Sequence, residues 1–115
     1  GIFIKLGTTG TTAGNIYYFT SAGAWALADK DSSAAATSLL GYAFTSAASN
    51  GIMLQGVVSS EGHGHTLGAP LYVRDSGAFS TTAPTSSGDY VRIIGYAINE
   101  DQIYFDPDKT FIERG

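Results

Sequence analysis

Short runs of apolar and aromatic residues alternate with clusters of Gly, Ser, Thr, Asn, Asp and Pro along the whole chain. The runs begin roughly every ten residues, and each is long enough for one short strand. This spacing, with turn residues between the runs, is typical of β-sandwiches and β-barrels. The pattern therefore predicts an all-β fold, a small barrel or sandwich with little or no helix.

The expected strands follow from the position of each run. They cover residues 2–6, 16–20, a short segment around Trp25, 39–46, 52–58, 70–74, a short segment around Phe79, 90–98, 103–105 and 110–113. Residues 21–23 and 75–77 supply hairpin turns that end on Gly, and residues 50–51 read Asn-Gly, a tight-turn sequence. Residues 32–38 are the only candidate helix, of one turn, because nothing caps a longer one.

The chain also repeats itself. Shifted by 54 positions, residues 14–44 fall on residues 68–98 with 9 identities over 31 positions. The identical residues are turn glycines, strand aromatics and small residues, which belong to a framework, and no catalytic group repeats. The sequence therefore predicts a single domain of two pseudo-repeated halves, about residues 12–58 and 66–106. In the first copy the identical residues are Gly14, Tyr18, Gly23, Ala24, Ser32, Ser33, Gly41, Tyr42 and Ala43.

Each copy contains one strand with a bulky face and a nearly smooth face. A smooth face lets another layer approach closely. We expect the two halves to pack on each other through these faces, and the alternative is that one smooth face lies against a neighbouring subunit. The bulky residues are Leu40, Tyr42 and Phe44, then Ile94, Tyr96 and Ile98; the smooth-face residues are Leu39, Gly41 and Ala43, then Ile93, Gly95 and Ala97.

Charge and composition narrow the possible partners. The net charge is −4 and the six Lys and Arg residues are scattered, which argues against a nucleic-acid partner. No apolar run approaches the ~20 residues of a membrane helix, and no signal-peptide pattern is present. Only 14% of residues are charged. Either a Thr- and Ser-rich β-surface or a partner subunit explains so few charges.

The chain starts at Gly1 and enters an apolar run at once. This beginning favours a domain cut from a longer polypeptide, as its C-terminal part, or a processed chain. Cysteine is absent, so disulfides and cysteine–metal sites are excluded.

Several strings resemble a recurring module of tailed-phage structural proteins. They are LLGYA at 39–43, GIMLQGVV at 51–58, GAPLYV at 68–73, APTSSGDYVRIIGYAI at 83–98 and IYFDP at 103–107. The module resembles the C-terminal β-domains of phage fiber-like and capsid-associated proteins and, more distantly, small capsid decoration proteins. The likeness spans residues 12–112 and consists of framework positions. It implies a structural role in a virion, and it carries over no catalytic residue.

Residues 61–65, Glu-Gly-His-Gly-His, are the one conspicuous chemical cluster and lie in the connector between the two copies. In an extended segment His63 and His65 point the same way, with Glu61 on their side. Two ligands are too few for a stable site in one chain, but three copies on a threefold axis would supply six nitrogens. The alternative is a Gly-rich surface loop that happens to hold two His. A transition-metal site at His63 and His65 is therefore a hypothesis, and no other cofactor is expected.

Signatures of enzymes are weak. No Ser lies in a Gly-x-Ser-x-Gly elbow, and both His share one loop, so a hydrolase triad is not indicated. Asp101, Asp106 and Asp108 lie in a turn and in the tail, where solvated charges are a simpler interpretation than paired catalytic carboxylates or a calcium site. We therefore do not expect an enzyme.

These observations predict a non-enzymatic bacteriophage virion protein, a fiber or capsid decoration domain. It would assemble with copies of itself, a trimer being favoured, and with other virion proteins. The low charge, the smooth strand faces and the many aromatic residues favour such assembly. The alternative is a receptor-recognition tip domain that binds a host surface glycan or protein through aromatic side chains on its outer face.

Overall fold

The computed structural model describes residues 1–115 and is nearly all β. The elements are β1 (Ile2–Ile4), β2 (Ile16–Phe19), β3 (Trp25–Leu27), α1 (Ser33–Thr37), β4 (Leu40–Ala43), the 3-10 turn η1 (Ala48–Asn50), β5 (Ile52–Ser59), β6 (Pro70–Val73), β7 (Phe79–Ser80), β8 (Tyr90–Val91), β9 (Ile93–Asn99), β10 (Gln102–Phe105) and β11 (Ile112–Glu113). The predicted all-β class and the single helical turn are confirmed. The Asn-Gly sequence, in contrast, closes a 3-10 turn in which Gly51 has a φ of 125°, instead of a two-residue hairpin.

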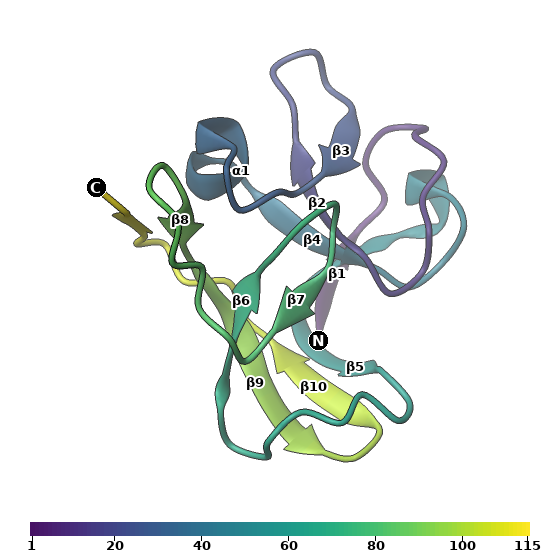
Figure 1. Cartoon of the computed structure of the whole chain (residues 1–115). Helices are drawn as coiled ribbons and strands as arrows, with labels where there is room; N and C mark the ends of the chain where they lie inside the picture. The colour runs from purple at the N-terminus through teal and green to yellow at the C-terminus, as the bar shows by residue number, and fades with distance from the viewer.

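Nine strands form one curled antiparallel sheet, and β8 with β11 forms a small second one (Figure 1). The order in the large sheet is β3-β2-β4-β5-β10-β9-β6-β7, with β1 added to β5. The first four strands of this order come from the first copy and the last four from the second copy, in reverse. The strand order is therefore the one that two pseudo-repeated halves joined at β5 and β10 would give.

Two clusters of buried residues fill the molecule. The larger lies inside the curled sheet and takes Ile16, Leu40 and Tyr42 from the first half and Leu71 and Phe105 from the second. The smaller lies on the outer side of the first half only, where Trp25 and Ile52 pack with the N-terminal segment. The members of the smaller cluster are Tyr17, Trp25, Ala43, Ala48 and Ile52, with Ile4, Leu6, Phe19 and Leu54 against them.

The expected packing of the two halves through their smooth faces is wrong. A Cβ on Gly41 would collide with Ile52 and approach Trp25 to 3.3 Å, so the smooth face of β4 is covered by its own half. The smooth face of β9 is not one face, because Ala97 is fully buried opposite Ile103 whereas Ile93 lines a surface hollow beside Tyr96. The prediction that Ile94, Tyr96 and Ile98 share one bulky face is also wrong in part. Tyr96 and Ile98 are exposed, whereas Ile94 is buried.

A turn of the second half closes the curled sheet against the first half. The backbone N–H of Ile16 donates to the carbonyl of Gly77, and Gly77 donates to the carbonyl of Ala28. Gly77 has a φ of 83°, and a Cβ there would lie 2.6 Å from Leu27. Glycine is therefore required at this point both for its backbone conformation and for its lack of a side chain.

Candidate functional site

The connector between the halves, residues 60–69, holds the two histidines beside a shallow hollow of about 500 Å³. Gly62 and Gly64 have φ values of 62° and 70°, so the connector turns and does not run extended as expected. The imidazoles of His63 and His65 nevertheless stack, with centroids 5.1 Å apart and planes 16° from parallel. His65 also rests against the ring of Phe79.

Both ring nitrogens of His63 take part in hydrogen bonds. Nδ1 accepts the backbone N–H of His65 at 2.9 Å, which requires the neutral imidazole with its proton on Nε2. Nε2 then donates to the carbonyl oxygen of Asn99. Burial lowers the pKa of His65, and a charge on His63 would lower it further. With both ring nitrogens in these hydrogen bonds, His63 has no free lone pair for a metal ion.

A metal ion at this place would have to replace at least one of these hydrogen bonds. The side chain of Glu61 is exposed and does not join the two histidines, and no group of three His, Cys, Asp or Glu side chains is placed to hold a metal within one chain. A site shared by three copies stays a prediction.

The acidic residues singled out from the sequence bond to backbone N–H groups or lie exposed. The Asp101 carboxylate accepts the backbone N–H of Gly62 at 3.1 Å and so fixes the connector. Asp108 accepts the backbone N–H and the hydroxyl of Thr110, and the first of these bonds is the main reason that the pKa of Asp108 is lowered. Asp106 is exposed on the segment that follows β10.

A charged residue that the sequence analysis did not single out, Arg92, is buried between β8 and β9. Its Nη1 donates to the carbonyls of Ala35, Ala36 and Ser38 at 2.8 to 3.2 Å, and its Nε donates to the carbonyl of Asp108. The carbonyls at the end of α1 have no partner within the helix, and a cation there is favourable. Arg92 thus ties the helix of the first half to the second half.

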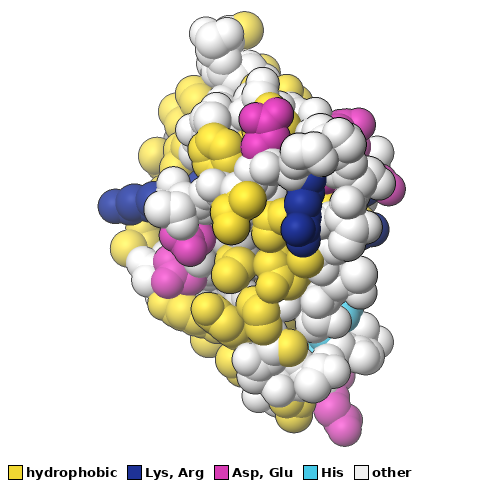
Figure 2. Space-filling model, turned by 60° about the vertical axis from the view of Figure 1, so that its left-hand side comes forward, with side chains coloured by type: hydrophobic (Ala, Val, Ile, Leu, Met, Phe, Trp, Pro, Cys, Tyr) yellow, Lys and Arg dark blue, Asp and Glu magenta, His cyan; other side chains and the backbone are white.

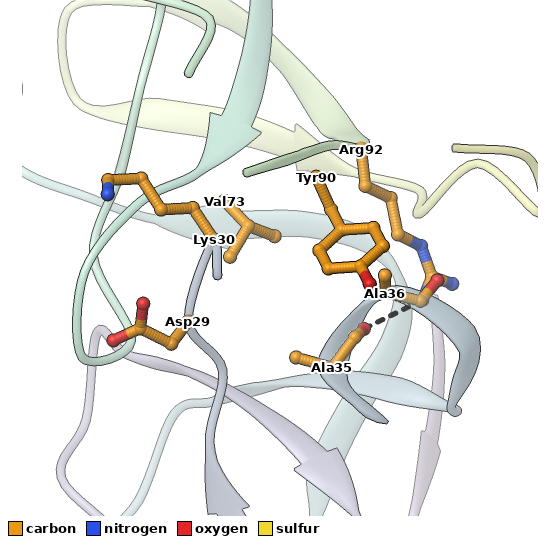
Figure 3. Close-up of a pocket in the computed structure, with 7 residues that line it drawn as sticks. All are labelled: Asp29, Lys30, Ala35, Ala36, Val73, Tyr90 and Arg92. Carbon is orange, nitrogen blue, oxygen red and sulfur yellow. Dashed lines mark hydrogen bonds between the residues drawn. The ribbon is translucent and has the colours of Figure 1, made fainter. Parts of the chain in front are cut away.

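The crevice around Arg92 is shown in Figure 3, with Tyr90 and Arg92 reaching toward Ala35 and Ala36. It leaves no space for a water molecule. Burial lowers the pKa of Arg92, but its charge is met by four carbonyls. The arrangement is a structural connection between the two halves. In the sequence it is marked only by a single Arg inside the apolar string Val91-Arg92-Ile93-Ile94.

An ion pair closes the other end of this crevice. The ammonium of Lys30 lies 3.4 Å from Asp89, whose carboxylate is almost fully buried, and 3.3 Å from the exposed Asp75. The hydrogen bond with Asp75 is the largest cause of the raised pKa of Lys30. Asp89 also accepts the backbone N–H of Ser86. These charges hold the turn 75–77 and the loop before β8 in place.

The outer face of β5, β10 and β9 carries exposed apolar side chains, among them Val57, Tyr96 and Ile98. Figure 2 looks from the side on which β8 and β9 lie in Figure 1, and it shows apolar side chains gathered in a broad band with charged groups beside it. The outer face of β5, β10 and β9 is the second candidate site. Its exposed apolar side chains suit contact with another surface.

A scan against protein-family models found no matching family, and searches of curated proteins and of solved structures found no significant match. None of the helices is of a length and apolarity that would let it cross a membrane.

Proposed function

We propose that this chain is a non-enzymatic structural domain of a bacteriophage virion, a fiber or capsid decoration domain. It assembles with copies of itself, as a trimer, and with other virion proteins. The observation that carries the proposal is the set of strings that resemble the phage module. In the structure the last three of these strings include β6, β9 and β10, which are neighbours in the sheet.

Two features of the structure support this role. The buried charged residues Arg92 and Asp89 are bonded to the backbone or to Lys30, so their charges serve the fold. The exposed apolar side chains lie on strands, where a rigid surface suits a permanent contact. An apolar outer face on a sheet would give such a domain a surface for assembly.

The test is to find the protein in the particle. Antibodies raised against the purified domain should detect the chain by immunoblot in virions of the phage whose genome encodes it. Gold-labelled antibodies should mark one defined part of each particle in electron micrographs. Presence of the chain in the lysate but not in purified particles would contradict the proposal. Saturable binding of the chain to host cells, if it occurs without incorporation, would favour a receptor-binding role.

A further inference from the structure

We propose that the outer face of β5, β10 and β9 is the surface by which this domain binds a second copy of itself. The inference rests on the proposed function, because it names the contact that assembly of the domain would use. It is carried by the direction of the side chains, the size of the face and its unpaired charges.

Tyr104 stands in the middle of this face. It pairs with Val57 on β5 and with Tyr96 on β9, and directly opposed residues of a sheet point to the same side. Its chain neighbours Ile103 and Phe105 are completely buried inside the curled sheet. Val57, Tyr104 and Tyr96 therefore form a row across three strands on the outside.

The row continues toward the N-terminal strand. Gln55 donates a hydrogen bond of 2.8 Å to the hydroxyl of Tyr104 and pairs with Ile2 on β1, and Ile2 is exposed. Two hollows of about 270 Å³ each lie beside the segment 106–109, one lined by Tyr96 and the other by Ile2. The face therefore extends from β1 to β9, with exposed apolar side chains on both sides of the charged segment 106–109.

The size of the face fits a partner protein. Val57, Tyr96, Ile98 and Ile2 are each 41 to 57% exposed. Since a large side chain offers about 150–250 Å², these four residues alone expose on the order of 350 Å² of surface. That area lies within the roughly 300–600 Å² of the largest patches of monomers, which often mark contacts. Two copies of these four side chains expose on the order of 700 Å², so neighbouring residues such as those of the segment 106–109 would have to supply the rest of the roughly 1,200 Å² of a small specific interface.

The charges on the face are suited to a second copy. Asp106 and Lys109 border both hollows, and neither forms an ion pair within the chain, since Lys30 makes the only ones. In a contact around a threefold axis, Lys109 of one copy can face Asp106 of the next.

The first half shows that the chain itself can cover such a face. There Ile4 and Leu6 of the N-terminal segment pack with Trp25 over the outer side of β4 and β5. In the second half the connector is hydrogen-bonded to Asn99 and Asp101, at the turn between β9 and β10. It does not cover the outer face of these strands. Outside the segment 106–109, this face is therefore the place where apolar surface of a second copy would complete the same kind of packing.

The test is sedimentation velocity of the purified chain across the micromolar range, with Val57→Glu and Tyr96→Glu as disrupting variants. Leu67→Glu is the matched control, because Leu67 is similarly exposed but lies on the connector. We expect the wild type and Leu67→Glu to associate equally, and both disrupting variants to dissociate at least about tenfold more readily, as for a residue central to an interface. Unchanged Trp25 fluorescence would show that each variant is folded.

Exchanging the charges of Lys109 and Asp106 tests whether this face lies against the same face of another copy. Lys109→Asp should weaken association, and the double variant Lys109→Asp with Asp106→Lys should restore it. A wild type that stays monomeric, or association that persists in both Glu variants, would overturn the inference while leaving the virion assignment to its own immunoblot. A monomeric chain whose binding to host polysaccharide is lost in Tyr96→Ala would overturn it in favour of a sugar-binding face.

Discussion

Tyr42 and Tyr96 occupy the same position in the two halves, yet Tyr42 is 2% exposed and Tyr96 is 41% exposed. The hairpins differ in the same way. Trp25 packs in the outer cluster of the first half, whereas its counterpart Phe79 packs against the inner cluster. The two halves therefore share the order of their strands, but these equivalent residues point to opposite sides of the sheet.

The inversion has a local cause in the sheet. The pairing of β6 with β9 shifts by one residue between Leu71 and Tyr72, so that Ile94 is the extra residue on β9. A shift of one residue moves every later side chain of a strand to the other face. Gly95 permits the shift, since it has a φ of 154° and a Cβ there would collide with the backbone of Tyr104. Ile94 therefore stays inside while Tyr96 turns outward.

Truncation of the two tyrosines should give the largest difference between the halves. We expect Tyr42→Ala to lower the free energy of unfolding by about 3–5 kcal/mol, because it empties a site in the inner cluster. Tyr96→Ala should lower it by less than about 1 kcal/mol. Urea denaturation at a concentration where the chain is monomeric measures both. Tyr42→Phe, which keeps the ring and loses only the bond to the carbonyl of Ser59, should fall between them. Equal losses for the two Ala variants would contradict the inversion.

Arg92 joins the halves at another pair of equivalent positions, since it corresponds to Ser38 and donates to the carbonyl of that residue. Arg92→Met should destabilise the fold by about 2–4 kcal/mol, because it leaves several buried carbonyls without a donor. Arg74→Met is the control, as Arg74 makes a single bond to the exposed Thr82, and should cost less than about 1 kcal/mol. Similar urea midpoints for the two variants would show that Arg92 is not the joint between the halves.

The equivalent turn glycines Gly23 and Gly77 make a third comparison. Both have φ near 80°, but a Cβ on Gly23 would meet nothing within 4 Å, whereas one on Gly77 would meet Leu27 and Asn15. Gly23→Ala should therefore cost about 1 kcal/mol for the backbone strain alone. Gly77→Ala should cost about 1–3 kcal/mol more, as overpacking does. Thermal unfolding followed by circular dichroism measures the melting temperatures of the two variants. Equal melting temperatures would mean that the turn 75–77 does not pack against Leu27 and Asn15.

The strands were predictable from the sequence, and their faces were not. The hairpin of β2 and β3, the one-turn helix and the end of β10 before Pro107 follow from turn residues and local periodicity. The side of Tyr96 depends on a bulge set by pairing with a distant strand, and no local pattern encodes it. The bonds of Arg92 join residues more than fifty positions apart, so only its unusual place in an apolar string was visible. The bent connector was hidden because glycine allows both extended and left-handed backbone.

Residues 60–65 of the connector have no counterpart in the repeat, and the two histidines there should make the smallest contribution to stability. Because burial lowers the pKa of His65, folding favours its neutral form. The stabilisation is therefore complete above the unfolded pKa of about 6.5 and is lost as the pH falls from there toward the folded value. We expect the free energy of unfolding to decrease by less than about 1 kcal/mol between about pH 7.5 and 5.5, since His65 is partly exposed. Urea midpoints measured across this range should vary less in His65→Gln than in the wild type. An identical slope in both proteins would place the pH dependence elsewhere, and a steeper slope in the variant would mean that His65 is stabilised in its charged form.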